Sequence, residues 1–405
     1  MLAALDCKTA LFASNGMETG FMVFFLSLSW YAMTVKTAHP WKLLGVAWGG
    51  IMWSRPDGFV YAGALAAAMI GFKAGLASSN GRGWFLRQYF YGMGLAVLIY
   101  LPWFLWTWSY YGTPISNTIV AKGLRGFGNP VEGLIEAFLT LITNNIFFQS
   151  PYFISATWNP LLVGWGDLLW LLAAAPVVLP CMSPMTRSAS AAFLISNFYL
   201  LMIVPYCWPW YIPNATWSGY LAIIMAWFDL GRYLEKKTKW LLGWKIICPA
   251  AVLIIPQIVL LCFVLQEMRV QQSVIEINNR KQVGLWLAQN SSPKETVFLE
   301  CVGYIGYYSQ LKMYDFPGMT SPEMVAARRT LDSDDYGSLI TCLHPDWLVL
   351  RPPEINKLSV DQISWLKINY NLVKIFDVSN AVAVANIEGI NILLFDRTFL
   401  VFHRA

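Results

Sequence analysis

The stretch LGWKIICPAAVLIIPQIVLLCFVL, residues 242–265, contains a single charged residue, Lys245. A helix crosses the hydrocarbon core of a bilayer with about 20 apolar residues, so this stretch predicts a membrane-spanning helix. The composition changes directly after it: residues 266–405 hold 28 of the 51 Lys, Arg, Asp and Glu side chains, in about a third of the chain. We therefore expect a transmembrane helical domain at 1–265 and a soluble domain at 266–405.

The composition of the first 265 residues is typical of a polytopic membrane protein. The whole chain is 13% charged, against about 25% in an ordinary soluble protein. A charge at mid-bilayer costs at least a few kcal/mol, which accounts for the depletion. About eight spans are predicted in total. Besides 242–265, they are 20–35, 43–54, 59–72, 88–108, 161–180, 188–206 and 216–231. Two of them, 43–54 and 59–72, are short enough to be half-length helices that meet at a polar turn.

Lys and Arg residues in the connecting loops predict the orientation, because they are enriched in cytoplasmic loops. Loops 36–42, 73–87, 181–187 and 232–245 carry eleven of them, whereas loops 14–19, 55–58, 109–160 and 207–215 carry three. The first set is therefore expected in the cytoplasm, and the second set faces outward together with 266–405. This alternation of inner and outer loops requires 134–148 to lie in the membrane interface rather than to cross the membrane.

The soluble domain is predicted to be a small α/β domain of about 140 residues. Helices are expected at 268–290 and 321–331. β-branched runs bounded by turn residues predict strands at 296–301, 312–316, 346–352, 370–378, 381–387 and 390–396. Cys301 and Cys342 share this domain, and the sequence leaves open whether they form a disulfide or stay free. The seven cysteines show no CxxC pair and no metal-ligand spacing, so no metal site is predicted.

Four polar clusters interrupt the apolar domain, all on the expected outward side: 14–19, 55–58, 110–122 and 208–213. Each has a purely structural interpretation. Glu18 could cap a helix N-terminus, and Arg55 could pair with Asp57 at a turn. Lys122 could touch lipid headgroups without specificity, and 208–213 could belong to an aromatic belt.

The same clusters also contain the groups that a lipid-linked substrate would meet. An Arg at the interface binds phosphate with two parallel hydrogen bonds. Aromatic rings form stacking walls for sugars and isoprenoid chains. A long loop such as 109–160 is frequently functional. Together these clusters indicate a substrate site on the outward side of the helical bundle.

At these residues the chain resembles bacterial polytopic glycosyltransferases of the GT-C superfamily, especially the group that includes the mycobacterial terminal arabinofuranosyltransferases. The resemblance rests on the order of several short motifs over about 310 residues. In the membrane domain they are Gly16-Met17-Glu18-Thr19, Arg55-Pro56-Asp57-Gly58, the loop with Tyr111, Gly112, Asn117, Thr118, Ala121 and Lys122, and Trp210-Tyr211 with Pro213 one place early. In the soluble domain they are Gly303 to Ser309 and Asp315 to Glu323.

The resemblance implies a GT-C-like bundle in the bacterial inner membrane, multi-pass, with its soluble domain on the outer, periplasmic side. It implies transfer of a sugar from a polyprenyl-phosphate donor to a cell-envelope glycan or lipid acceptor, with membrane lipids and no nucleic acid among its partners. The residues expected to bind the donor phosphate or substrate are Arg55, Asp57, Asn117, Lys122, Trp210 and Tyr211. Whether a divalent metal is required stays open.

The chain departs from the family at its beginning. In the superfamily the general base is usually an Asp or Glu on the first outward loop, and no such loop precedes Gly16. We therefore expect the base upstream of Met1, with Glu18 and Asp57 as the fallback. On this expectation the 405-residue chain is an inactive fragment, in which Asp6 and Lys8 are left without packing partners.

Two other function classes stay open. A carrier, flippase or polymerase of cell-surface glycans predicts polar residues buried in mid-span and helices broken at the bilayer centre. A non-catalytic glycan-binding or assembly component predicts no carboxylate-lined outward cavity.

Overall fold

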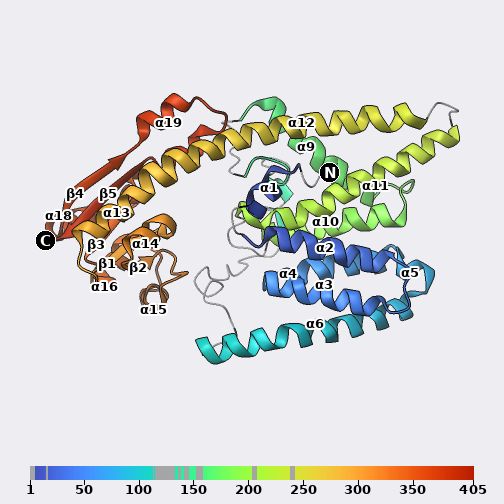
Figure 1. Ribbon diagram of the computed structural model, residues 1–405, viewed down its shortest axis with the longest axis horizontal. Coiled ribbons are helices and arrows are strands. Elements are labelled where there is room, and N and C mark those ends of the chain that lie inside the picture. Colours follow the sequence, from blue (N-terminus) through green and yellow to red (C-terminus); the bar gives the residue numbers. More distant parts are fainter. Residues whose placement is uncertain are drawn as a thin grey trace. The chain divides into compact units, whose positions relative to one another are not determined.

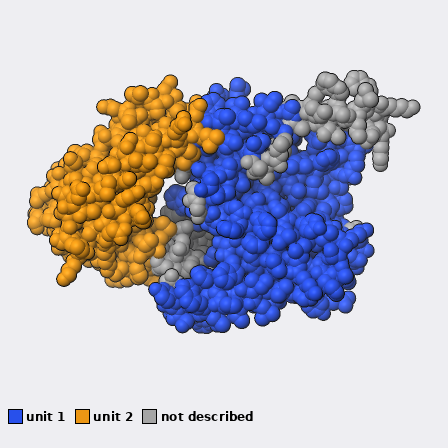
Figure 2. All heavy atoms as spheres, viewed as in Figure 1, with its two compact units in different colours: residues 1–114, 125–264 blue, residues 115–124, 265–405 orange. Residues whose placement is uncertain are grey.

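The computed structural model describes residues 5–14, 17–112, 114, 132, 134–135, 138–140, 146–151, 158–202, 208–237 and 242–405. The chain forms two compact units, coloured in Figure 2. Unit 1 comprises Met1–Pro114 and Arg125–Val264, and unit 2 comprises Ile115–Leu124 and Leu265–Ala405. The predicted fold class is confirmed in its coarse form: the chain is mostly helical and carries a small sheet domain at its C-terminal end.

Unit 1 is built from helices, and each of the eight apolar stretches singled out in the sequence holds one (Figure 1). The helices are α1 (Cys7–Ser14), α2 (Thr19–Thr34), α3 (Pro40–Ser54), α4 (Gly58–Gly71), α5 (Leu76–Ser79), α6 (Arg82–Tyr111), α9 (Pro160–Ala174), α10 (Pro184–Met202), α11 (Pro213–Lys237) and α12 (Leu242–Val270), with short 3-10 turns η3 (Ala175–Val177) and η4 (Pro209–Tyr211).

Three helices in the described part of the chain are long and apolar enough to cross a membrane: Arg82–Tyr110, Pro160–Val177 and Leu253–Asn290. A fourth crossing results if α1 and α2 form one bent span. Helices α3 and α4 have 15 and 14 residues, fewer than the roughly 20 that a full crossing needs. These lengths are compatible with a membrane protein in which α3 and α4 are half-length helices joined by a turn.

Helices α3 and α6 pack closely because α3 presents two glycines to α6. A Cβ added at Gly45 would lie 2.6 Å from Leu95 Cβ, and one added at Gly49 would lie 2.8 Å from Ile99 Cγ2. Small residues four apart let helix backbones approach in this way in membrane bundles. The packing fixes α3, and with it the turn at 55–57 that follows its last residue.

Unit 2 contains a five-stranded sheet in the order β2-β1-β3-β5-β4. The strands are β1 (Thr296–Leu299), β2 (Lys312–Asp315), β3 (Trp347–Leu350), β4 (Tyr370–Asp377) and β5 (Thr398–Arg404). Strand β1 pairs in parallel with β2 and β3, whereas β5 runs antiparallel to both β3 and β4.

Helices connect the strands of unit 2 and cover the sheet. They are η5 (Gln271–Arg280, a π-helix), α13 (Lys281–Asn290), α14 (Val302–Ser309), α15 (Pro322–Leu331), α16 (Tyr336–Leu343), α17 (Pro352–Ile355), α18 (Val360–Asn369), α19 (Ser379–Ala385) and the 3-10 helix η6 (Ile390–Asp396). The helices expected at 268–290 and 321–331 are present.

Two of the six predicted strands are wrong. Residues 381–387 belong largely to α19, and 390–396 form η6. Val382 of α19 and Leu393 of η6 are buried against Ile275 of η5, so tertiary packing decides the conformation of a short apolar run that fits either structure. The strand missing from the prediction is β5, which lies between β3 and β4.

Candidate functional site

The turn between α3 and α4 places Arg55 at the centre of a cluster of charged and aromatic side chains. Arg55 follows the last residue of α3 and is 7% exposed. Its Nε donates a hydrogen bond to Asp57 Oδ1 at 2.9 Å, and its Nη2 donates to Asp57 Oδ2 at 3.1 Å. Arg55 and Asp57 therefore form the bidentate pair that the turn sequence allowed.

Glu18 joins this cluster from a segment 37 residues away in the sequence. Arg55 Nη1 donates to Glu18 Oε1 at 2.7 Å. Glu18 occupies the N-cap position of α2, but its carboxylate makes no capping hydrogen bond. The capping interpretation is therefore wrong for the side chain, which binds the guanidinium instead.

Two tyrosines complete the surroundings of Arg55. The Arg55 guanidinium carbon lies 4.1 Å from the ring centroid of Tyr211, in η4, which is a cation–π geometry. Tyr199 of α10 donates its hydroxyl proton to Asp57 Oδ2 at 3.3 Å. Beside Tyr211, the rings of Trp208 and Trp210 stack at 5.2 Å with an interplanar angle of 2°.

Three of the four sequence clusters thus meet in unit 1: Glu18 from the first, Arg55 and Asp57 from the second, and the aromatic residues Trp210 and Tyr211 from the fourth. Asn117 and Lys122, from the third cluster, lie outside the described residues. Tyr199 was missed, because a tyrosine inside an apolar helical run carries no motif.

The charges of the cluster do not cancel. One guanidinium faces two carboxylates, so the formal charge is −1. Three of the five N–H donors of Arg55 are used, and each terminal nitrogen keeps one N–H outside these bonds. The side chains of Glu18 and Asp57 are 29% and 22% exposed, against 8% for Arg55. The two carboxylates are therefore more exposed than the guanidinium that they bind.

A second polar cluster of unit 1 is fully buried. Asp6 accepts hydrogen bonds from the Thr9 backbone N–H at 2.8 Å and from the Tyr220 hydroxyl at 3.0 Å. Gln257 of α12 donates to Tyr220 at 3.1 Å. Lys8 Nζ donates to the carbonyl oxygen of Ile146 at 3.0 Å. Asp6 and Lys8 are both 0% exposed, so the expectation that they lack packing partners is wrong.

Unit 2 has its own charge network, at the carboxyl ends of β1 and β3. Arg351 directly follows β3 and forms ion pairs with Glu300, Glu354 at 2.6 Å and Asp396 at 2.7 Å. Burial raises the pKa of Glu354, and the Arg351 charge opposes this shift. Burial likewise raises the pKa of Cys301, above its usual range.

The second motif of unit 2, Asp315 to Glu323, has a structural role. Asp315, at the end of β2, is 0% exposed and accepts hydrogen bonds from the backbone N–H groups of Met319 at 2.8 Å and Thr320 at 3.0 Å. It thereby holds the turn that contains Gly318. Cys301 and Cys342 are both free thiols. Within the described residues, no three His, Cys, Asp or Glu side chains are grouped to hold a metal ion.

Comparison with known proteins gives one match, which covers residues 266–402. This segment matches the family described as "Domain of unknown function (DUF8728)". The match lies within unit 2 and leaves the helical unit, with the Arg55 cluster, outside it. No curated protein and no solved structure matches the chain.

Proposed function

We propose that this protein transfers a sugar from a polyprenyl-phosphate donor to a cell-envelope glycan or lipid acceptor at the outer face of the bacterial inner membrane. The observation that carries the proposal is the meeting of Glu18, Arg55 and Tyr211 in one cluster. They come from three sequence-distant motifs that the GT-C resemblance singles out. The order of these motifs in the sequence does not say whether they lie close together in space. Their proximity in the fold therefore supports the proposal independently of the motif order.

In this proposal Arg55 binds the donor phosphate. Its two N–H groups outside the carboxylate bonds point from the two terminal nitrogens, which suits two phosphate oxygens. Asp57 holds the guanidinium from behind through two hydrogen bonds. As the sugar leaves the phosphate, negative charge grows on the phosphate oxygens, and the guanidinium stabilises it.

Within this chain we assign the general base to Glu18 rather than to Asp57, and a base upstream of Met1 is the alternative. Asp57 accepts bonds on both oxygens, two from Arg55 and one from Tyr199. Glu18 accepts one, on Oε1, from the described part of the chain. A carboxylate with an oxygen outside such bonds is better placed to take the proton of an acceptor hydroxyl. The stacked Trp208 and Trp210 rings offer a wall for the sugar or the isoprenoid chain.

The test is sugar transfer by the purified 405-residue chain, with a labelled polyprenyl-phosphate sugar and a membrane-derived acceptor. Transfer would place the base within this chain, and its absence would keep the base upstream of Met1. Replacing Arg55 by Ala should lower transfer roughly 10-fold or more. Arg55→Lys keeps the charge but loses the bidentate fork, so we expect an intermediate loss. Arg87→Ala, at an exposed position of α6, is the control and should be neutral. Transfer by Arg55→Ala at the level of the unmodified protein would remove Arg55 from the mechanism.

A second function, a carrier of lipid-linked glycans, is favoured by the buried network of Asp6, Tyr220 and Gln257. Two of its members lie within α11 and α12 rather than at helix ends, and buried polar groups of this kind mark transport paths in membrane proteins. The distinguishing variant is Asp6→Asn. A carrier would lose movement of a labelled lipid-linked glycan across vesicles, whereas a transferase would keep its donor affinity.

A further inference from the structure

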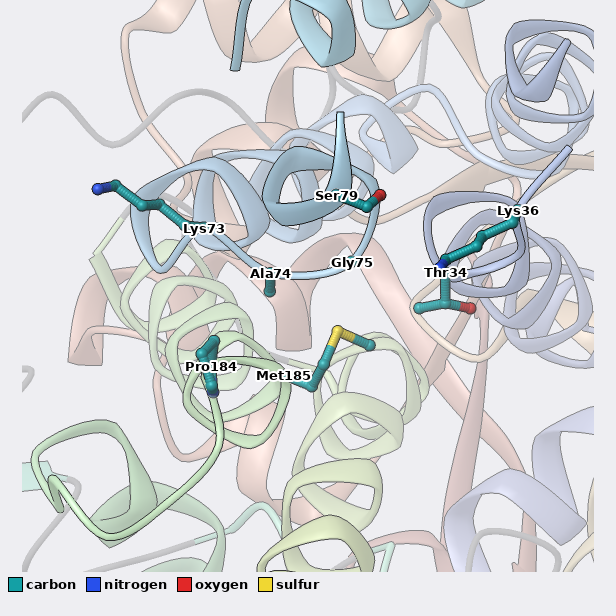
Figure 3. A pocket seen from close by; sticks show the side chains of 8 residues that line it. All are labelled: Thr34, Lys36, Lys73, Ala74, Gly75, Ser79, Pro184 and Met185. Atoms are coloured by element: carbon teal, nitrogen blue, oxygen red, sulfur yellow. The ribbon is translucent and has the colours of Figure 1, made fainter. Parts of the chain in front are cut away.

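A hollow in unit 1 lies at the opposite ends of α2 and α4 from the Arg55 cluster. Its volume is about 380 Å³, and its lining residues are Thr34, Lys36, Lys73, Ala74, Gly75, Ser79, Pro184 and Met185. They come from three places in the sequence: the end of α2, the segment from the end of α4 through α5, and the start of α10. Figure 3 shows Lys36 and Lys73 on opposite sides, with Ala74 and Gly75 between them.

The lining of this hollow is positively charged. It contains two ammonium groups and two hydroxyl groups, and none of the eight lining residues is acidic. Asp229 lies close in the fold, because it accepts hydrogen bonds from the Ser183 N–H at 2.7 Å and the Thr186 hydroxyl at 2.5 Å. Its other oxygen pairs with Arg232 at 2.7 Å. Arg232 therefore balances the charge of Asp229, and none of the lining residues that the structure describes offers a carboxylate to the two lysines.

The backbone around Lys73 is formed at a conformational cost. Lys73 has φ +52°, in the left-handed region where glycine is normally found after a helix. The Ala74 N–H bonds to the Met69 carbonyl at 2.9 Å, which closes the end of α4. At Gly75, also with positive φ, a Cβ would lie 2.6 Å from the Met33 carbonyl oxygen. The segment is thus held tightly against the end of α2 and keeps a lysine where glycine would be less strained.

The remaining lining is apolar. Ala74 is buried, and Met185 is half-buried at the start of α10. An apolar floor below two exposed lysines matches a lipid headgroup, whose phosphate is anionic and whose glycerol and acyl carbons are apolar. The Lys73 ammonium points away from the hollow in Figure 3, and its flexible four-carbon stem lets it turn toward a bound anion.

From these observations we propose that the hollow between the ends of α2 and α4 and the start of α10 binds the phosphate group of an anionic lipid headgroup. Lys36 and Lys73 supply the charge, and Thr34 and Ser79 supply hydroxyl donors. The loops that form it are those whose Lys and Arg content predicts the cytoplasmic side, where anionic lipids attract basic segments. The proposal does not depend on sugar transfer, because it involves none of the residues of the Arg55 cluster.

The test is lipid titration of the purified full chain in detergent, followed by native mass spectrometry. The probes are phosphatidylglycerol, the zwitterionic phosphatidylcholine and inorganic phosphate. The double variant Lys36→Gln/Lys73→Gln should bind phosphatidylglycerol roughly 30-fold more weakly, since each lysine near an anionic lipid is worth about 1 kcal/mol. The matched control is Lys42→Gln, an exposed lysine at the start of α3 that does not line the hollow, and it should change nothing.

A second variant tests whether the shape of the hollow, and not only the charge of its lysines, is needed for lipid binding. Met185→Trp keeps both lysines but fills the apolar floor, so phosphatidylglycerol binding should fall in this variant too. If Met185→Trp fails to fold, as judged by circular dichroism, the lysine pair alone decides the test. If inorganic phosphate displaces the lipid and its binding depends on the same two lysines, the hollow is a site for free phosphate that uses the same anion-binding groups. Equal binding of the two lipids, or unchanged phosphatidylglycerol binding by the double variant, would overturn the proposal.

Discussion

Glu18 and Asp57 bond to the same guanidinium but differ in what they leave for a substrate. Asp57 uses both oxygens and also receives the Tyr199 hydroxyl, whereas Glu18 is bonded through Oε1 and is the more exposed of the two. The two carboxylates should therefore have separable effects. Loss of Asp57 should disturb the position of Arg55, and loss of Glu18 should disturb proton transfer.

We predict that Glu18→Gln lowers kcat by about 100-fold or more while the KM for the donor stays nearly constant, since general base catalysis contributes 10²- to 10⁴-fold. Asp57→Asn should instead raise the KM for the donor, because the guanidinium loses its bidentate support. The measurement is steady-state transfer kinetics, with Asp167→Asn in α9 as the control. An unchanged kcat in Glu18→Gln would show that a residue other than Glu18 is the general base.

A second prediction concerns the buried Glu354 of unit 2. Burial raises its pKa in the folded state, so its stabilising contribution is present below the unfolded value, about 4.3, and is lost as pH rises through the folded value. Stability of the sheet should therefore fall as pH rises above about 4.3. Glu354→Gln should flatten this dependence, and Asp361→Asn, an exposed carboxylate of α18, should not.

The measurement for Glu354 is amide hydrogen exchange of Trp347–Leu350 in the full chain, corrected at each pH for intrinsic exchange. An undiminished pH slope in Glu354→Gln would show that another group titrates there.

The site was partly foreseeable at the residue scale. Arg55, Asp57 and Glu18 stand out in the sequence because charged residues are rare in the first 265 positions. The packing of α2, α3 and η4 then brings these three side chains together. Tyr199 could not be found, since it lies within an apolar run and its role depends on a hydroxyl group 142 residues from Asp57. The sequence also gave no sign that Glu18 would bind Arg55 instead of capping α2.

Among the elements, the close pair of α3 and α6 rests on two glycines that no motif marks in the sequence. Gly45 and Gly49 are spaced four apart, and each would place a Cβ under 3.0 Å from a side-chain atom of α6. Because the turn at Arg55 follows α3, this helix pair carries the cluster. A substitution that disturbs the packing of α3 against α6 should therefore affect the Arg55 cluster as well as the stability of the fold.

We expect Gly49→Val to lower stability by about 1–3 kcal/mol, the usual cost of overpacking, and to reduce donor binding with it. Gly63→Val is the matched control: it places the same side chain on α4, where an added Cβ meets nothing within 4 Å. Thermal unfolding of the purified protein in detergent measures the difference. Equal melting temperatures for the two variants would contradict the close approach of α3 and α6.

The strands show where local pattern is sufficient and where it fails. β1, β2, β3 and β4 were predicted because short runs rich in β-branched or aromatic residues lie between clear turn residues. β5 was missed although its sequence is apolar, because its place between β3 and β4 comes from pairing with residues far away in the chain. Residues 381–387 and 390–396 fit strands locally, but α19 and η6 form there, because Val382 and Leu393 are buried against Ile275 of η5.

At the scale of the whole molecule, the orientation is a prediction of the loop charges alone. It places loop 181–187 inside and residues 266–405 outside. Three of the described cysteines are exposed: Cys181, Cys262 and Cys342. Two of them make the orientation testable without new thiols, since Cys181 belongs to that loop and Cys342 to unit 2. Because both side chains are exposed, a difference in labelling reports the side of the membrane rather than burial.

In intact cells, a membrane-impermeant maleimide should label Cys342 and leave Cys181 unlabelled until the membrane is opened with detergent. Cys207 belongs to loop 207–215, which is also expected outside, so the comparison is made in a Cys207→Ser background, where Cys342→Ser should remove the outer signal. Labelling of Cys181 with protection of Cys342 would reverse the orientation and move the Arg55 cluster to the inner face.

The central claim is that the Glu18–Arg55–Asp57 cluster holds a polyprenyl-phosphate donor. It is tested most directly by photo-crosslinking a labelled polyprenyl-phosphate sugar, with the photoreactive group near the phosphate, to the full chain. The account predicts attachment to peptides containing Glu18, Arg55 or Tyr211, reduced roughly 10-fold or more by Arg55→Met and unchanged by Arg87→Met. Attachment at the hollow of Thr34, Lys36 and Met185 instead, or equal labelling of Arg55→Met, would contradict it.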